Sequence, residues 1–225
     1  MPEESTRIRA RELAAEAAAS GDGTGWFEQL YTEAQAGLSV VPWADGEPNP
    51  NLVSWADGRA GQGRSALVVG CGLGDDAEFL AGLGFAVTAF DVAPTAVAAA
   101  QRAHPASLVR YVTADLLSLP ASWAGAFDLV LEAYTVQPLY GATRAAAIDA
   151  LHIPVAPDGT LLVIARATDE QDPVRDPAQM PWALTRAELD AMAAGVLRPV
   201  RVEQFRDDEQ PPRLRWRAEF RRDRG

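Results

Sequence analysis

The chain has 225 residues, of which 48% are hydrophobic and 23% charged, a composition typical of one globular domain. Thirty-one Asp and Glu residues against 20 Lys and Arg residues give a formal net charge of −11. A protein this acidic is repelled by phosphate backbones and anionic lipids, so we expect neither nucleic acid nor a membrane surface as a partner.

Cysteine use and the N-terminus bear on the compartment. Cys71 is the single cysteine and cannot form an intramolecular disulfide, which fits a reducing environment. Residues 1–4 are acidic and precede no apolar run typical of a secretory signal. No apolar run reaches the roughly 20 residues that cross a bilayer. We therefore expect a cytoplasmic protein, either a monomer or a small homo-oligomer.

The first 51 residues predict two helices and a loop. Residues 6–19 are rich in good helix formers, and the polar, Gly-containing segment 20–23 ends that helix. Apolar residues then recur with helical spacing at Phe27, Leu30, Tyr31, Ala34 and Leu38. Residues 40–51 are too dense in Pro and Gly for a helix or a strand, so we expect an ordered loop there.

From residue 65 onward, short apolar strands alternate with helices. We expect strands over 66–69, 86–90, 108–113, 127–131 and 160–165, helices over 75–83, 94–103, 143–151 and 186–194, and a closing strand pair over 196–206 and 213–222. This alternation predicts βαβ units, and the short turn at 210–212 predicts an antiparallel hairpin at the sheet edge. The expected fold class is α/β: a doubly wound, mainly parallel seven-stranded sheet whose last strand is antiparallel.

The last strand alternates in polarity. Leu214, Trp216, Ala218 and Phe220 share one face, and Arg213, Arg215, Arg217 and Glu219 share the other. The arginine row has two interpretations, an anion-binding patch or a solvated sheet face. The net negative charge and the acidic turn at 207–209 favour a solvated face.

A glycine-rich turn, Gly70-Cys71-Gly72-Leu73-Gly74, joins the first strand to a helix. Glycines there let the backbone approach a ligand closely, at a helix N-terminus that presents free N–H groups. A dinucleotide-binding turn would need Gly at position 75, where the chain has Asp75 followed by Asp76. These carboxylates oppose a pyrophosphate, and so a nucleotide-dependent oxidoreductase. They suit S-adenosylmethionine, which has no phosphate and carries a sulfonium and an ammonium.

Acidic residues at strand ends supply further candidate ligands of such a cofactor. Asp91 ends the second strand, where a carboxylate can accept both ribose hydroxyls, although it could instead cap the helix over 94–103. Asp115 follows the third strand and can accept the adenine amine. Glu132 ends the fourth strand, whereas Asp128 at its start is expected to be structural. The candidate cofactor-binding residues are Gly70, Cys71, Gly72, Gly74, Asp91, Val92, Asp115, Leu116 and Glu132.

Four stretches together resemble the class I S-adenosylmethionine-dependent methyltransferases: Leu67–Gly74, Thr88–Asp91, Ala114–Leu116 and Phe127–Val130. The resemblance covers about residues 65–222, including the antiparallel last strand of that fold. It implies an enzyme that transfers a methyl group from S-adenosylmethionine to a small-molecule substrate and releases S-adenosylhomocysteine, with no metal.

The N-terminal segment has a narrower resemblance. Pro42–Leu52 is similar to the Pro-Trp…Gly-x-Pro-x-Pro segment of the thiopurine and thiol/halide methyltransferase family, although the acidic residue of that pattern falls at Asp45, one step late. This resemblance implies that residues 1–52 form a helical lid over a cofactor-binding domain at 53–225. Tyr31 and Trp43 would then contact the cofactor or the acceptor. The alternative is that these aromatic side chains only pack.

The acceptor side is less defined. Tyr134 and Arg166 follow the fourth and fifth strands and are the candidate catalytic residues, and the loop 169–177 is expected to cover the site with Met180 and Trp182 as walls. A thiol acceptor needs no strong base, since a few per cent of a free thiol is ionised at pH 7. We therefore expect a thiol or a similar soft nucleophile. The alternatives are an O- or N-methyltransferase and a non-catalytic S-adenosylmethionine sensor.

Overall fold

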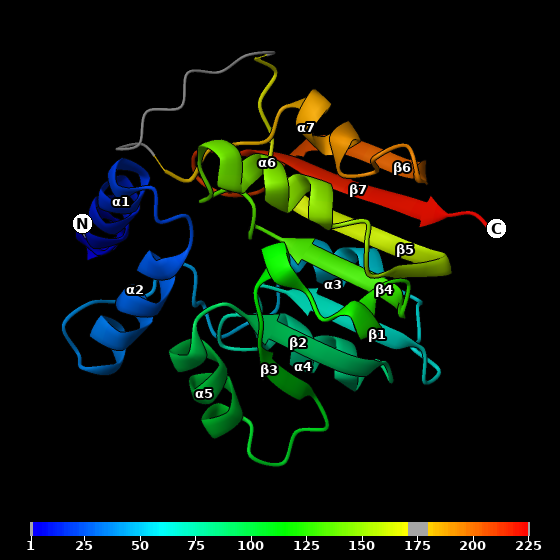
Figure 1. Cartoon of the computed structure of the whole chain (residues 1–225), viewed down its shortest axis with the longest axis horizontal. Coiled ribbons are helices and arrows are strands. Elements are labelled where there is room, and N and C mark those ends of the chain that lie inside the picture. Colours follow the sequence, from blue (N-terminus) through cyan, green and yellow to red (C-terminus); the bar gives the residue numbers. More distant parts are fainter. Residues whose placement is uncertain (1, 171–179, 225) are drawn as a thin grey trace.

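The computed structural model describes residues 2–170 and 180–224, which build one seven-stranded sheet with the strand order β3-β2-β1-β4-β5-β7-β6 (Figure 1). The strands are β1 (Ser65–Val69), β2 (Ala86–Asp91), β3 (Arg110–Thr113), β4 (Phe127–Ala133), β5 (Val155–Arg166), β6 (Leu197–Arg206) and β7 (Leu214–Arg222). β7 pairs antiparallel with both β5 and β6, and every other pairing of these strands is parallel. The predicted fold class is confirmed.

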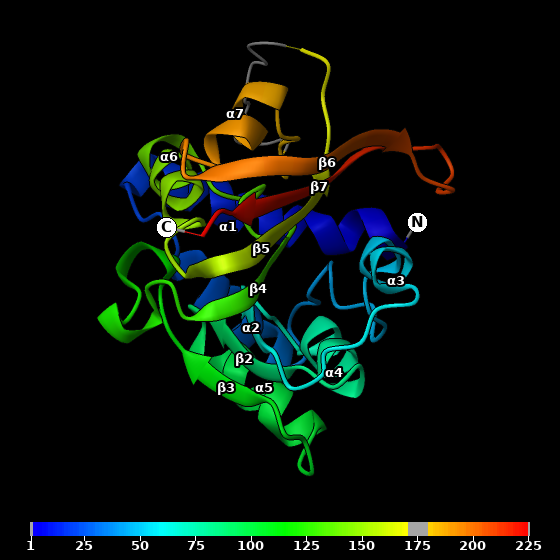
Figure 2. The same cartoon turned by 90° about the vertical axis from the view of Figure 1, so that its right-hand side faces the viewer.

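Helices cover both faces of this sheet (Figures 1 and 2). They are α1 (Pro2–Ser20), α2 (Gly25–Gln35), α3 (Pro50–Ala56), α4 (Asp75–Gly82), α5 (Pro94–Ala103), α6 (Gly141–Ala150) and α7 (Arg186–Ala191), with short 3-10 turns η1 (Leu116–Ser118) and η2 (Ala121–Trp123). Within the described residues, no helix is both long enough and apolar enough to cross a membrane.

The central strands are apolar on both faces because both faces are covered. In β1, Ala66 and Val68 join a core with residues of α3, α4 and α5. Leu67 and Val69 face the opposite way and join a core with residues of α6 and α7. This two-residue alternation explains why β1 is a continuous apolar run rather than an amphipathic strand.

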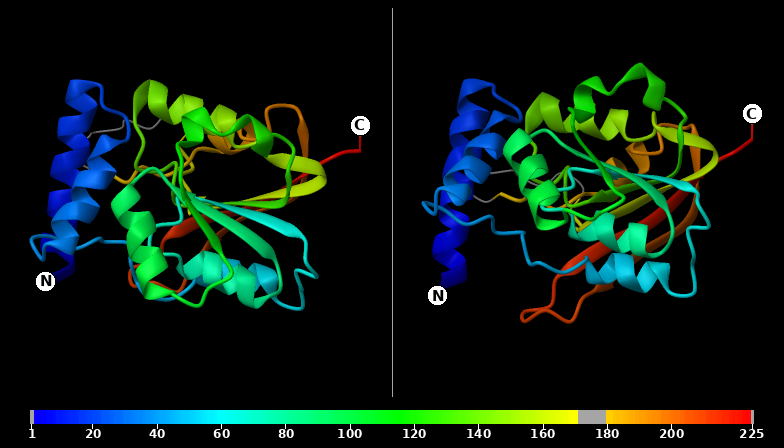
Figure 3. Two further views of the ribbon diagram at one scale, coloured as in Figure 1. Left: turned by 60° about the horizontal axis from the view of Figure 1, so that its bottom comes forward. Right: turned by 90° about the horizontal axis from the view of Figure 1, so that it is seen from below.

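The N-terminal helices α1 and α2 form a separate layer beside the ends of the strands (Figure 3). Arg9 of α1 donates to Glu33 of α2 at 2.7 and 2.8 Å. The Glu28 carboxylate of α2 accepts the Thr95 backbone N–H at 3.0 Å and the Thr95 hydroxyl at 2.5 Å. The N-terminus of α5 is therefore bonded by a residue of α2, which fixes this layer to the sheet domain.

One helix was missed in the predicted loop over 40–51. α3 begins at Pro50 and runs across the predicted boundary at 52/53. The Asn49 side chain accepts the Asn51 backbone N–H at 2.9 Å, and Pro50 occupies the first turn. This is a typical helix start, which the density of prolines obscured.

Candidate active site

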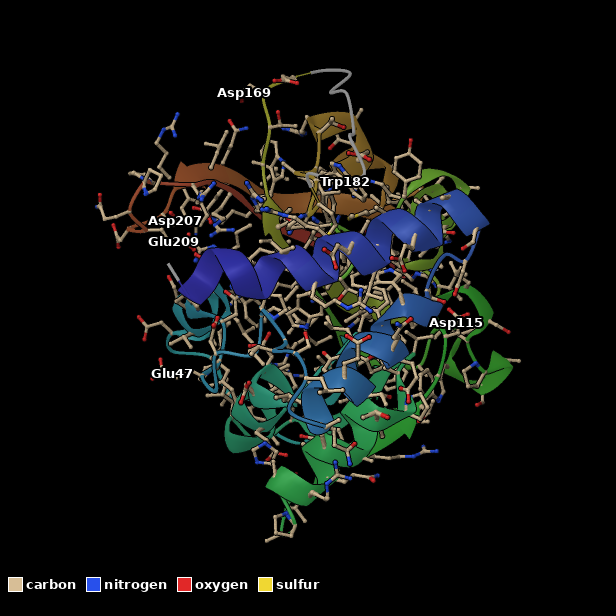
Figure 4. All side chains as sticks on the ribbon, turned by 90° about the vertical axis from the view of Figure 1, so that its left-hand side faces the viewer. Glu47, Asp115, Asp169, Trp182, Asp207 and Glu209 are labelled. Atoms are coloured by element: carbon tan, nitrogen blue, oxygen red, sulfur yellow. The ribbon has the colours of Figure 1, made fainter. Side chains whose placement is uncertain are left out.

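A cavity of about 1040 Å³ lies where the parallel strands end. It is lined by the glycine turn, by residues at the carboxyl ends of β2, β3, β4 and β5, and by Phe27 and Tyr31 of α2. Residues of the segment 42–51 and of the β6–β7 hairpin complete the lining. Doubly wound sheets bind their ligands at the carboxyl ends of the parallel strands. Figure 4 looks onto α1 and α2 and shows Asp207 and Glu209 on one side of these helices and Asp115 on the other.

The glycine turn adopts positive φ angles of +62° at Gly70, +52° at Gly72 and +98° at Gly74, which favour glycine. A Cβ at Gly70 would lie 2.6 Å from Thr135, and one at Gly74 would overlap the Tyr111 hydroxyl. Gly70, Cys71 and Gly72 line the cavity. Gly74 is not among the lining residues and instead starts α4.

Asp91 is 6% exposed, and its carboxylate holds the glycine turn through a hydrogen bond. Its Oδ2 accepts the Gly72 N–H at 3.0 Å, and its Oδ1 accepts the Ala93 N–H at 2.9 Å. Burial raises the pKa of this carboxyl, while both backbone bonds lower it. Each carboxylate oxygen has a second lone pair available for a ligand hydroxyl. The position predicted for Asp91 is thus the one the structure gives, beside the turn and in the cavity wall.

Three further predicted residues lie in the same wall. Val92, Asp115 and Leu116 all line the cavity. The Oδ1 of Asp115 accepts the Leu117 N–H at 2.9 Å, which holds the carboxylate at the start of η1. Together with the glycine turn and Asp91, these residues form what we call the glycine wall.

The two aspartates at the start of α4 differ in role. Asp75 lines the cavity, and burial raises its pKa. Asp76 accepts the Asn49 N–H at 2.7 Å, and burial raises its pKa to about 6. Asp76 therefore fastens the loop 42–51 to α4. Both carboxylates keep the N-terminus of α4 unfavourable for a phosphate group.

The predicted aromatic residues of the N-terminal segment reach this wall. Phe27, Tyr31 and Trp43 line the cavity. The Trp43 indole N–H donates to the Tyr31 hydroxyl at 3.0 Å, and a Cβ at Gly72 would lie 3.1 Å from that hydroxyl. Burial and the nearby charge of Asp91 raise the pKa of Tyr31, so its phenol stays protonated. Burial likewise raises the pKa of the Cys71 thiol.

Glu132 lies behind the cavity rather than in its lining. Its side chain is fully buried, and its Oε1 accepts the N–H groups of Thr135 at 2.9 Å and Val136 at 3.0 Å. Burial raises its pKa to about 7. We predicted Glu132 as a cofactor-binding residue. The structure shows it holding the turn after β4, whose residues line the cavity.

The candidate catalytic residues Tyr134 and Arg166 both line the cavity. Tyr134 has a positive φ of +61°, and the Arg215 guanidinium lies over its ring at 5.3 Å from the centroid. Burial raises the pKa of Tyr134, so its phenol is neutral at pH 7 and can donate a hydrogen bond. Arg166 donates from Nη1 to the Pro181 carbonyl at 3.2 Å.

The expectation of a solvated arginine face on β7 is wrong for Arg215. This side chain is 7% exposed, lines the cavity, and pairs with Asp207 at 2.5 Å and with Glu209. Arg217 on the same face pairs with Glu203 at 2.9 Å. The acidic end of the hairpin folds back over the strand, and strand alternation alone does not show what covers a face. With Tyr134, Gln137 and Arg166, Arg215 forms what we call the side-chain wall.

Of the expected covering loop, residues 171–177 lie outside the described residues. Met180 lines the cavity, as predicted. Trp182 is not among the lining residues; it is buried against α1 and α2 side chains, and its ring lies 5.4 Å from that of Tyr140. Among the residues that the structure describes, no cluster of His, Cys, Asp or Glu could hold a metal ion.

Sequence analysis missed Gln137, which is 2% exposed and lines the cavity. One signal was available, because Gln137 is a polar residue within the turn that follows the carboxyl end of a buried strand. Asn49 was missed for a different reason. Its contribution depends on α4, which is distant in sequence.

The chain was compared with protein-family models, curated sequences and solved structures. Residues 67–163 match a family model described as a methyltransferase domain. No curated protein sequence matches the chain.

Solved structures share the fold over most of the chain. A protein studied for the conversion of a disulfide bond into a thioacetal group during echinomycin biosynthesis has a TM-score of 0.69 at 25% identity, covering 87% of this chain and 93% of its own. The 1,6-didemethyltoxoflavin-N1-methyltransferase of Burkholderia thailandensis has a TM-score of 0.65 at 21% identity, and the match covers 87% of this chain and 86% of that one. The N-methyltransferase NodS of Bradyrhizobium japonicum has a TM-score of 0.63 at 22% identity, and the match covers 87% of this chain and 98% of that one.

The domain match contains the glycine turn, Asp91, Asp115 and all of β4, and each of the three solved structures covers 87% of the chain. The chain therefore contains a methyltransferase domain and shares its fold with solved methyltransferase structures.

Proposed function

We propose that this protein binds S-adenosylmethionine at the glycine wall and transfers a methyl group to a small-molecule acceptor, releasing S-adenosylhomocysteine. The observation that carries the proposal is the lining of one cavity by the glycine turn, Asp91 and Asp115. Asp75 supports a phosphate-free ligand there, because its carboxylate would repel a pyrophosphate.

When bound, S-adenosylmethionine supplies a methyl group that its sulfonium already activates. Asp91 accepts ribose hydroxyls with the lone pairs left over from its two backbone bonds, and Asp115 accepts the adenine amine. Val92 and Leu116 supply apolar surface for the adenine ring. The residues that hold the reactants supply proximity and orientation, which account for much of the rate of such a transfer.

We propose that residues 1–52 act as a lid. The bonds Glu28–Thr95 and Asn49–Asp76 hold this segment against the sheet domain, and the Trp43–Tyr31 bond joins its loop to α2 beside the cavity. The rings of Tyr31 and Trp43 exclude water, and aromatic ring faces attract a cation such as a sulfonium. The similarity of Pro42–Leu52 to thiopurine and thiol/halide enzymes lies outside the matched residues 67–163 and stays a prediction.

For the acceptor, we propose a thiol or a similar soft nucleophile. No histidine lines the cavity among the described residues, and the Tyr134 phenol is neutral, so neither an imidazole nor a phenolate is available there as a base. A thiol ionises without one. The echinomycin-related protein, which is described as converting a disulfide into a thioacetal, also acts at sulfur. We further propose a cytoplasmic location and a monomer or small homo-oligomer.

The proposal is tested in two steps. Calorimetry with S-adenosylhomocysteine comes first, and absence of binding at millimolar ligand would contradict every form of the proposal. Release of S-adenosylhomocysteine from S-adenosylmethionine is then measured with panels of thiols, halides, phenols and amines. Turnover with phenols or amines but with no thiol favours the O- or N-methyltransferase alternative. Binding without turnover on any panel favours the sensor.

A further inference from the structure

The side chain of Gln137 is fixed in the side-chain wall. It is buried, it lines the cavity, and its Oε1 accepts the backbone N–H of Arg166 in a short hydrogen bond. A backbone N–H can only donate, so the atom that faces Arg166 is the amide oxygen. This contact determines where the other atom of the amide, Nε2, must lie.

The backbone of Gln137 is held as firmly as its side chain. Its carbonyl accepts the Trp182 N–H at 3.1 Å and Arg144 Nη1 at 3.2 Å. Arg144 also donates to the Val136 carbonyl at 3.1 Å, and the Glu132 carboxylate accepts the Val136 N–H from the opposite side. The turn therefore presents the amide in one orientation without needing a ligand to order it.

The Nε2 group of Gln137 has no hydrogen-bond partner among the described residues. Among the described residues, three side-chain polar atoms are completely enclosed and have no hydrogen-bond partner: Glu132 Oε2, His152 Nδ1 and Arg222 Nε. Gln137 Nε2 is not one of them. This nitrogen therefore keeps some accessible surface, on a side chain that lines the cavity. A donor held at a site that is largely removed from water favours a ligand that pairs with it.

Resting on the proposed function, we propose that Gln137 Nε2 donates a hydrogen bond to the methyl acceptor and so selects acceptors that carry a carbonyl oxygen near the reacting atom. Gln137 is on the side of the cavity with Tyr134 and Arg166, and Asp91 and Asp115 are on the glycine wall. The neutral amide distinguishes an uncharged carbonyl from a hydrocarbon, because the hydrocarbon leaves the donor unpaired.

The test uses two thiols with the same number of heavy atoms, methyl thioglycolate, which carries an ester carbonyl near its sulfur, and 1-pentanethiol, which has only a hydrocarbon chain there. Their dissociation constants are measured by NMR on the full chain saturated with S-adenosylhomocysteine, so that no transfer occurs. Gln137→Glu keeps an oxygen for the Arg166 N–H and removes the donor; Gln137→Leu removes both. Gln204→Glu, at an exposed site that does not line the cavity, adds the same charge and is the control.

We expect wild type and Gln204→Glu to bind methyl thioglycolate more tightly than 1-pentanethiol, and both Gln137 variants to lose about 10-fold of that preference. Each variant must keep its S-adenosylhomocysteine affinity. An unchanged ratio, or a wild type that binds neither thiol, overturns the inference. If the preference shifts as expected but no acceptor is ever methylated, the proposed function fails and the role of Gln137 in binding stands.

Discussion

The two walls of the cavity are built in opposite ways. The glycine wall is mostly backbone held by side chains, since Asp91 bonds Gly72 and Ala93 and Asp115 bonds Leu117. The side-chain wall is mostly side chains, brought together from the turn after β4, from β5 and from β7 and held by both backbone and side-chain partners. The first wall leaves little freedom in its sequence because its shape depends on positive φ angles. The second can change its chemistry without changing the fold.

Gly72→Val gives the largest expected effect and tests the glycine wall directly. Gly72 has a φ of +52°, and its Cβ would lie 3.1 Å from the Tyr31 hydroxyl, so valine both strains the turn and fills space beside the cavity. We expect the thermal shift produced by S-adenosylhomocysteine to disappear. In wild type, ligand at 100 times its dissociation constant stabilises the fold by roughly 2.7 kcal/mol.

Gly58→Val is the control for backbone strain, because Gly58 has a φ of +69° with nothing within 4 Å of its Cβ position. This variant should lose stability and keep the thermal shift. A Gly72→Val protein that still binds the ligand would show that the backbone of the turn does not form the binding surface.

Glu132→Gln tests the support behind the side-chain wall through its pH dependence. Burial raises the pKa of Glu132 from 4.5 to about 7, so the protonated form is the one that the fold favours. Its contribution to stability is full below pH 4.5 and is lost as the pH rises through 7. Between pH 4.5 and about 8, wild type should lose roughly 3 kcal/mol more stability than Glu132→Gln.

Urea unfolding at several pH values measures this difference, and the comparison of the two proteins cancels the other titrating groups. Parallel curves of unfolding free energy against pH for the two proteins would mean that burial does not raise the pKa of Glu132. S-adenosylhomocysteine affinity should be similar in both, because Glu132 does not line the cavity.

Asp91→Ala removes one of the two carboxylates, Asp91 and Asp115, of the glycine wall. Charge-assisted hydrogen bonds are worth about 1.5–3 kcal/mol, so the affinity for S-adenosylhomocysteine should fall roughly 10- to 150-fold. Asp128→Ala is the matched control, since that carboxylate accepts the Ser65 N–H and hydroxyl at 2.8 Å at the opposite ends of the strands. It should lower the melting temperature without changing the affinity. Equal affinities of wild type and Asp91→Ala would leave Asp91 a purely structural role.

The contact between Trp43 and Tyr31 gives the smallest expected effect. Trp43→Phe, Tyr31→Phe and the double variant form a cycle around the bond between the indole N–H and the phenol. We expect a coupling of about 0.5–1.5 kcal/mol in the free energy of unfolding. Additive effects of the two substitutions would show that this bond does not hold the loop that carries Trp43 against α2.

The difference between the walls also explains what sequence analysis achieved. Gly70, Gly72, Asp91 and Asp115 lie in or directly after buried strands, so a local pattern places them at one edge of the sheet. Arg215 could not be placed in that way, because its burial depends on Asp207 and Glu209 folding back over β7.

Two omissions have different physical origins. The start of α3 was readable, since Asn49 and Pro50 are a typical cap and first residue. The role of Gln137 was not, because it follows from the hydrogen bond to Arg166 on the neighbouring strand. Residues whose function depends on a partner far along the chain are not visible in local patterns.

The position of β7 between β5 and β6 has a consequence for folding. Among the strands that carry the glycine wall, β1 pairs with β2 and β2 with β3 at separations of about 20 residues. By contrast, β7 must insert beside β5, with Thr160 opposite Arg221, and the pairing of β1 with β4 is equally distant in sequence. Pairings of long sequence separation form slowly because the intervening loop must be closed first. During refolding we therefore expect amide protection at β1 and β2 before Arg215 is buried, so a partly folded chain would have its cofactor surface before it can distinguish one acceptor from another.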